Sequence, residues 1–289
     1  YPEICFWSHL SKGKQYQKFL IDWFRYRSLC SADYWIFETE ILARRAMVLA
    51  RFPADRVSVV RMSPSILVGQ EHVDPKKKGM YESRFPKGYR LLFLASGNPN
   101  KRIHLVGPIV RTLEESRYCD RPIYVVTTLD ERCAYFENLR QAFHRAGVAS
   151  SFCNIGPVPP SDVASVISCC DVMCLFSALE SFSNNVVEAW SMGVPLVITD
   201  ADWARDAAGN GALYVNPNDT AVTAERIGHV LMNSDYARSL QVAGDAALST
   251  YLSGVEKMNA YLKCIEAVGT LGPLTANDRR SIKPWLDLC

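Results

Sequence analysis

The sequence lacks any hydrophobic run that approaches the roughly 18 residues needed to span a bilayer. It also lacks a recognisable signal peptide, an internal repeat and a low-complexity tract. These absences argue against an integral membrane protein and predict a cytoplasmic one. The chain begins at Tyr1 without Met and in the middle of a pattern, so we expect it to be a fragment of something longer.

Cysteines are numerous, but no two of the ten stand in a CxxC arrangement. The closest group, Cys169, Cys170 and Cys174, lies where a helix is expected to run into a strand, so these side chains should point to different faces. We interpret the cysteines as small buried thiols in a reducing compartment and not as a disulfide framework. No other cluster has metal-ligand spacing, and we expect neither a metal nor a cofactor.

The charges nearly balance, with 32 basic against 30 acidic residues and a net charge of +2, which does not indicate a nucleic-acid binder. Basic residues nevertheless gather in two places, and the first group is interleaved with aromatic side chains. The groups are Lys12, Lys14, Lys18, Arg25 and Arg27 with Trp7, Tyr16, Phe19, Trp23 and Tyr26, and then Lys76, Lys77, Lys78, Arg84, Lys87 and Arg90. Two interpretations stay open: solvated surfaces, or peripheral contact with an anionic membrane surface or a phosphate-bearing acceptor.

From about residue 90 onward, short apolar runs alternate with segments of helical periodicity, which predicts an α/β fold with a parallel sheet. The expected strands are 91–95, 123–127, 151–154, 172–176, 196–199 and 212–215. The expected helices are 100–116, 131–146, 161–169, 184–192 and 202–208, followed by 220–232, 236–252 and 255–267. We expect a six-stranded doubly wound sheet in the spatial order 3-2-1-4-5-6, which makes the first and fourth strands neighbours.

The flanking segments differ from this pattern. A strand at 34–37, a helix from about Glu40 and a strand at 57–61 predict the last part of a second α/β domain, at 1–64. We expect 65–89 to be an irregular link, 65–269 to be the Rossmann-like domain, and 270–289 to be a tail that returns to the first domain.

Ligands of doubly wound sheets bind beyond the carboxyl ends of the strands, at the switch point. Two polar loops leave the expected neighbouring strands: "ASGNPNKR", from Ala95 to Arg102, and "SALESFSNN", from Ser177 to Asn185. Each is expected to enter a helix, so two helix N-termini with unpaired N–H groups should face one crevice. Lys101 would add a full charge in the first turn of one helix. This arrangement suits a phosphate or a diphosphate.

Two glutamates flank the second helix start. A carboxylate repels phosphate, so we expect neither to touch it. Glu188 lies four residues past Asn184, about 6 Å along the helix, where it can accept hydrogen bonds from a ribose. Glu180 precedes the helix and can face the hydroxyls of a sugar. The two glutamates together therefore predict a nucleotide-sugar as the ligand. The alternatives are that Glu188 is a solvated helix acid, Glu180 a loop acid and Lys101 a surface lysine.

The stretch "ALESFSNNVVEAWSMGVPLVITD" resembles the Glu-x7-Glu signature of retaining glycosyltransferases of family 4, which have the GT-B fold. "GNPNKRI" resembles the phosphate-binding entry into the first C-terminal helix of that family. "IGPVPPSDVASVISCCDVMCLFS" resembles the segment between these two, and "GNGALYVNPND" resembles the segment that follows. The match covers roughly residues 57–235.

The resemblance implies transfer of a hexose-like sugar from a UDP-, GDP- or ADP-sugar to an acceptor hydroxyl, with retention and without a metal. The acceptor would be a glycan, a lipid-linked sugar or a small molecule, and the role would lie in polysaccharide or glycan biosynthesis. Glu180 and Lys101 would be the catalytic residues. The implied donor-binding set is Gly97, Asn98, Lys101, Gly156, Val158, Glu180, Ser181, Phe182, Ser183, Asn184, Asn185 and Glu188.

Two departures from the family pattern are visible. Ser96, Gly97 and Asn98 stand where many relatives carry an arginine of the diphosphate clamp, and 183–185 reads Ser-Asn-Asn where many have Gly-x-Pro. The glycine-rich first loop of the acceptor-side domain is also absent, so we expect this chain to bind nucleotide but to transfer poorly alone. Alternatives are a non-catalytic nucleotide-sugar-binding module and a nucleotide-sugar epimerase of the same fold. A two-carboxylate hydrolase fits less well, because a helix start separates the acids.

Overall fold

The computed structural model describes residue 21, residues 23–24, 27–28 and 30–282. By its contacts the chain divides into two compact units. The larger unit comprises 64–179 and 183–251. The smaller unit comprises the described residues up to Ser63, Glu180–Phe182 and the described residues from Leu252 on. Residues 252–269 therefore group with the smaller unit, whereas we expected them in the Rossmann-like domain.

The larger unit is built on a six-stranded parallel sheet with the order β5-β4-β3-β6-β7-β8. This is the predicted order 3-2-1-4-5-6, and β3 and β6 are neighbours through Leu91–Val172 and Leu92–Met173. The strands are β3 (Tyr89–Phe93), β4 (Ile123–Thr127), β5 (Phe152–Asn154), β6 (Val172–Leu175), β7 (Leu196–Thr199) and β8 (Leu213–Val215). The doubly wound α/β fold is confirmed.

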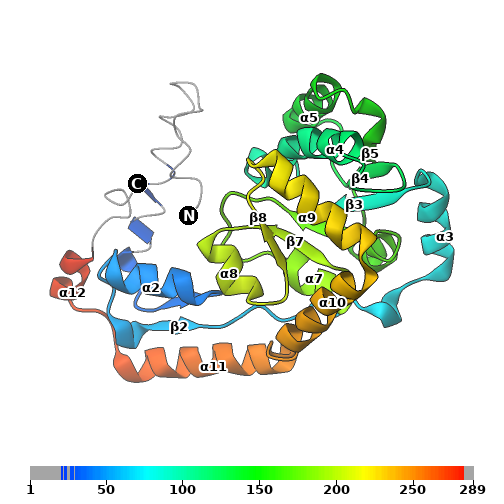
Figure 1. Ribbon diagram of the computed structural model, residues 1–289. Helices are drawn as coiled ribbons and strands as arrows, with labels where there is room; N and C mark the ends of the chain where they lie inside the picture. Colours follow the sequence, from blue (N-terminus) through cyan, green and yellow to red (C-terminus); the bar gives the residue numbers. More distant parts are fainter. Residues whose placement is uncertain (1–20, 22, 25–26, 29, 283–289) are drawn as a thin grey trace. The chain divides into compact units, whose positions relative to one another are not determined.

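Helices cover the sheet and close its core (Figure 1). They are α3 (Pro75–Arg84), α4 (Val106–Glu115), α5 (Ala134–Arg145), α6 (Val163–Ile167), α7 (Asn184–Ser191), α8 (Asp202–Ala208), α9 (Thr220–Met232) and α10 (Ser234–Leu248). α4 packs against α5 and α9, α3 against α6, and α10 against both α7 and α9. Strand and helix side chains such as Leu91, Val125, Ile109 and Phe143 are fully buried between these layers.

Two helix predictions were wrong. The expected irregular link at 65–89 contains α3, which begins at Pro75 behind Asp74, whose carboxylate accepts hydrogen bonds from two N–H groups of the first turn. The helix expected over 100–116 begins only at Val106 and follows two short 3₁₀ turns, Pro99–Lys101 and Ile103–Leu105. Pro108 stands in the first turn of α4, the only part of a helix that tolerates proline well.

Three of the six basic side chains on and around α3 make contacts within the fold. Lys77 pairs with Asp162 at 2.5 Å, Arg84 donates to the Ile155 carbonyl, and Arg90 donates to the Cys169 carbonyl. The proposed membrane contact stays a prediction. The aromatic and basic group near the amino end lies mostly outside the described residues.

The smaller unit contains a parallel pair of strands, β1 (Trp35–Phe37) and β2 (Val57–Val59), with the helix α2 (Glu40–Val48). The expected tail contains a helix, α12 (Ala276–Ser281), which follows the long α11 (Gly254–Leu271). A small core unites both ends of this unit. It comprises Trp35, Ala46, Ala50, Phe52, Leu274 and Ile282.

Candidate nucleotide-sugar site

The loops that follow β3 and β6 are joined directly by hydrogen bonds. The Asn100 carbonyl accepts a bond from the Ala178 N–H at 2.9 Å, and Asn100 Nδ2 donates to the Leu179 carbonyl at 2.7 Å. Because β3 and β6 are adjacent parallel strands, both loops leave the same edge of the sheet. The β3 loop and the first part of the β6 loop, residues 177–179, are thus joined within the larger unit.

Lys101 lies in a 3₁₀ turn and not in the first turn of an α-helix, contrary to our expectation. Asn98 begins that turn, and its side chain accepts a hydrogen bond from the Asn100 N–H at 2.9 Å. Arg102 then adopts a left-handed conformation, with φ 48° and ψ 29°, which ends one 3₁₀ turn and starts the next. Only one α-helix, α7, therefore begins directly at this place, and the prediction of two converging α-helix starts was wrong.

A hydrogen bond from Asn185 anchors the start of α7. The first turn of this helix has no side-chain cap. Ser183 is the N-cap residue, and its side chain makes no capping hydrogen bond. Asn184 is exposed, whereas Asn185 is buried and its Nδ2 donates to the Leu94 carbonyl at 2.7 Å. The Asn185 side chain thus binds the end of β3, and its contact with a diphosphate stays a prediction. The uncapped N–H groups and the helix dipole favour an anion at this point.

Glu188 lies one turn into α7 and is partly buried. Burial raises the pKa of its carboxyl group from 4.5 to about 7. Its Oε2 atom is buried and has no hydrogen-bond partner among the described residues. A buried carboxylate is costly unless donors satisfy it, so this side chain is suited to a ligand that brings hydroxyl groups.

Glu180, Ser181 and Phe182 group with the smaller unit, although the residues on either side belong to the larger one. Within the smaller unit, Ser181 Oγ donates to Glu38 Oε2 at 3.4 Å, and Phe182 is buried. The catalytic role of Glu180 stays a prediction.

The two glycines predicted to bind the donor, Gly97 and Gly156, differ in their local surroundings. A Cβ atom at Gly97 would lie 2.3 Å from Cys133 Sγ, so the backbone there passes too close to α5 for a larger residue. Gly156, with φ 78°, follows β5 and faces open space, and Val158 lies in the same loop. Their part in a base pocket stays a prediction.

Sequence reasoning missed three residues of this region. Arg102 Nε donates to the Phe176 carbonyl at 2.7 Å. Asn100 Oδ1 and Ser177 Oγ are buried without a hydrogen-bond partner among the described residues, like Glu188 Oε2. Asn100 and Ser177 stood inside the two loops that we singled out, but a lone Asn or Ser gives no signal of such burial.

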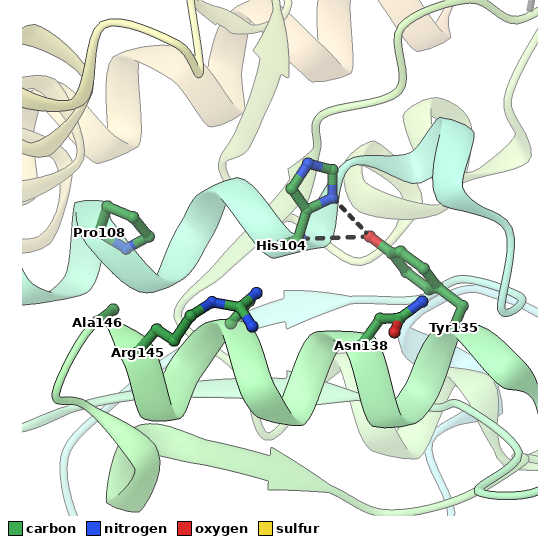
Figure 2. A pocket seen from close by; sticks show the side chains of 7 residues that line it. His104, Pro108, Tyr135, Asn138, Arg145 and Ala146 are labelled. Atoms are coloured by element: carbon green, nitrogen blue, oxygen red, sulfur yellow. Dashed lines mark hydrogen bonds between the residues drawn. The ribbon is translucent and has the colours of Figure 1, made fainter. Parts of the chain in front are cut away.

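A hollow of about 460 Å³ lies between the start of α4 and α5, lined by His104, Pro108, Tyr135, Asn138, Ala142, Arg145 and Ala146 (Figure 2). The Tyr135 hydroxyl lies 3.1 Å from His104 Nδ1 and accepts a hydrogen bond from the His104 N–H. Burial and the nearby charge of Arg102 lower the pKa of His104. None of the predicted donor-binding residues lines this hollow.

No helix in the described part of the chain is both long enough and apolar enough to pass through a membrane. No group of three or more His, Cys, Asp or Glu side chains among the described residues is arranged to hold a metal ion. All eight cysteines within the described ranges are free thiols.

Solved structures share this fold at low sequence identity. A glycosyltransferase from Rickettsia africae superposes with a TM-score of 0.69 at 14% identity, covering 82% of this chain and 64% of that one. HepE from Anabaena, in complex with UDP and glucose, gives 0.68 at 17%, with coverages of 82% and 64%. Sucrose-phosphate synthase from Thermosynechococcus elongatus gives 0.66 at 15%, with coverages of 86% and 61%. These likenesses confirm the predicted GT-B-like fold.

Sequence comparison identifies the family. D-inositol 3-phosphate glycosyltransferase of Corynebacterium urealyticum is 29% identical over 137 residues, which are 46% of this chain and about a third (32%) of that protein. The family described as Glycosyl transferases group 1 matches residues 88–233, which hold all six strands of the sheet, both joined loops and Glu188. Since that match spans half of the chain, this protein belongs to the group 1 glycosyl transferases.

Proposed function

We propose that this protein transfers a sugar from a nucleoside-diphosphate sugar to an acceptor hydroxyl, with retention of the anomeric configuration. The observation that carries the proposal is the carboxyl group of Glu188, one turn behind an uncapped helix start, whose buried Oε2 atom has no hydrogen-bond partner among the described residues. A diphosphate at the helix start places the neighbouring ribose one helical turn away, where its hydroxyls can donate to Glu188.

The leaving group is the nucleoside diphosphate, which gains charge as the bond to the sugar breaks. The N–H groups at the start of α7 favour that charge, and a helix terminus contributes about 0.3–2 kcal/mol toward an anion. Lys101, in the joined loop beside them, supplies a positive charge. Donors fixed in place before the reaction favour the transition state because they need no reorganisation. Glu180 would accept hydrogen bonds from the transferred sugar.

UDP-sugars are the first donors to test, followed by GDP- and ADP-sugars. Support for this order comes from HepE, a structural relative that binds UDP and UDP-glucose. The acceptor is a glycan, a lipid-linked sugar or a small molecule. The curated relative acts on an inositol phosphate, by its name, which makes a phosphorylated polyol a reasonable acceptor to include.

The decisive experiment measures binding and turnover with matched variants. Isothermal titration with UDP, GDP and ADP, followed by the corresponding sugars, should give saturable binding to the wild-type chain. In Glu188→Gln, affinity should fall about 10- to 100-fold, because the neutral amide accepts ribose hydroxyls less strongly than a carboxylate. Glu225→Gln changes an exposed helix acid of the same unit and should leave affinity unchanged.

Product analysis then separates the reaction types. Magnetic resonance of the product should show the anomeric configuration of the donor. Binding of nucleotide-sugars without turnover in a longer natural chain would favour a binding module. Conversion of the donor sugar without any acceptor would favour an epimerase. Release of sugar from a nucleotide-free glycoside would favour a hydrolase. If no nucleoside diphosphate binds, the proposal is wrong.

A further inference from the structure

Arg102 has an unusual backbone conformation for its residue type. Its φ of 48° lies in the left-handed region, which residues with a Cβ atom seldom adopt. It stands between the two 3₁₀ turns of the β3–α4 loop, immediately after Lys101. Such a conformation persists only where the surrounding contacts enforce it, and this is often the case at functional sites.

Those contacts come from the Arg102 side chain. Nε donates to the Phe176 carbonyl at 2.7 Å, and one terminal nitrogen donates to Thr199 Oγ1 at 2.8 Å and to the Ser177 carbonyl at 3.5 Å. Phe176 and Ser177 directly follow β6, and Thr199 is the last residue of β7. A single side chain from the β3 loop therefore joins the carboxyl ends of three adjacent strands, β3, β6 and β7.

The guanidinium also carries its charge into a partly buried place. Its acceptors in the described part of the chain are neutral, namely two carbonyls and one hydroxyl, and burial lowers the pKa of Arg102. Its positive charge is therefore not cancelled by an ion pair with a described residue and acts on its surroundings. The neighbouring His104, which faces the hollow in Figure 2, has a lowered pKa partly because of this charge.

We propose that Arg102 is the positioning residue of the diphosphate site. Its left-handed backbone and its guanidinium hold the Lys101 turn against the loop that enters α7, and its uncancelled charge adds to the positive potential there. Arg102 thus provides, at the end of the loop, the positive charge that Ser96, Gly97 and Asn98 do not provide at its start. This inference rests on the proposed function, because it assumes that a nucleoside diphosphate binds at this place.

Three full-chain variants test it. Arg102→Gly removes the side chain and relaxes the backbone. Arg102→Lys keeps the charge and the same backbone strain but loses the planar fork that reaches three acceptors. Arg117→Gly is the matched control, because Arg117 also has a positive φ, 53°, but its side chain is exposed on the α4–β4 link. Each variant is titrated with UDP, GDP and ADP, and its thermal unfolding is recorded without ligand.

We expect Arg102→Gly to weaken nucleoside diphosphate binding about tenfold or more and Arg102→Lys to restore part of the loss, whereas Arg117→Gly binds like the wild type. A partial recovery of affinity in Arg102→Lys would show that the positive charge of residue 102 contributes to binding, beyond any stabilisation of the loop. If Arg102→Gly does not fold, Arg102→Lys decides alone: weaker binding by a folded protein supports the inference.

The experiment distinguishes a failure of the proposed function from a failure of this inference. A wild-type chain that binds none of the three diphosphates overturns the proposed function and the inference with it. A wild-type chain that binds, beside a folded Arg102 variant with the same dissociation constant, overturns the inference and leaves the proposed function intact.

Discussion

Glu188 makes the stability of the fold depend on pH. Its pKa is raised from 4.5 to about 7 in the folded chain, so the native state holds a proton that the unfolded state has lost between these values. The stabilisation is fully present below about pH 4.5 and is lost as the pH rises through 7. A shift of this size corresponds to roughly 3 kcal/mol in the free energy of unfolding.

Glu188→Gln should remove that dependence, because glutamine stays neutral at every pH. Urea unfolding at pH 5, 6, 7 and 8 should show the variant gaining stability relative to the wild type as the pH rises. Glu225→Gln serves as the control, since its side chain is exposed. A difference between Glu188→Gln and the wild type that stays constant from pH 5 to pH 8 would show that Glu188 is not buried in a neutral form.

At the scale of elements, α7 is fixed to the sheet by its own first turn. Asn185→Ala removes the donor to the Leu94 carbonyl and should lower the free energy of unfolding by about 1–3 kcal/mol, because a buried acceptor loses its partner. Asn184→Ala, one residue earlier and exposed, should change it by no more than about 0.5 kcal/mol. Urea unfolding of both variants checks this contrast. Equal effects would mean that the hydrogen bond does not anchor the helix.

Much of the element pattern was readable from the sequence. Alternating apolar and helical segments predicted a parallel sheet, and the strand order rested on the assumption that the chain reverses after its third strand, as it does in the sheet. Gly147 and Gly193, at φ 76° and 61°, stand where the predicted helices end. Two errors had signals that were overlooked: Asp74 followed by Pro75 marks the start of α3, and Pro108 marks the start of α4.

Other features had no local signal. The left-handed backbone of Arg102 goes with side-chain hydrogen bonds to acceptors just after β6 and at the end of β7, more than 70 positions away in the chain. The buried state of Glu188 was only implied by its apolar neighbours. The role of Asn185 depends on the Leu94 carbonyl, which lies just past the end of β3 and 91 positions earlier in the chain. Tertiary contacts decided these three, and a sequence read one segment at a time does not contain them.

At the scale of the whole molecule, the smaller unit should be separable from nucleotide binding. Arg279 pairs with Asp33 and donates to the Cys30 carbonyl, so it joins α12 to the other end of that unit. Arg279→Ala should lower the free energy of unfolding by about 1–3 kcal/mol without changing the affinity for UDP, GDP or ADP. Calorimetric unfolding and isothermal titration of the same variant test both halves. A loss of affinity would show that the two units are coupled.

The smaller unit is completed late in protein synthesis, because its two ends lie far apart in the sequence. The Arg56 guanidinium donates to the carbonyls of Leu271 and Gly272, which are 215 and 216 positions further along. At typical ribosomal speeds, the first part of this unit waits on the order of 10–40 s before its partner segment exists. During that interval Trp35 and Phe52, which stack in the finished core, lack two of their packing partners, Leu274 and Ile282.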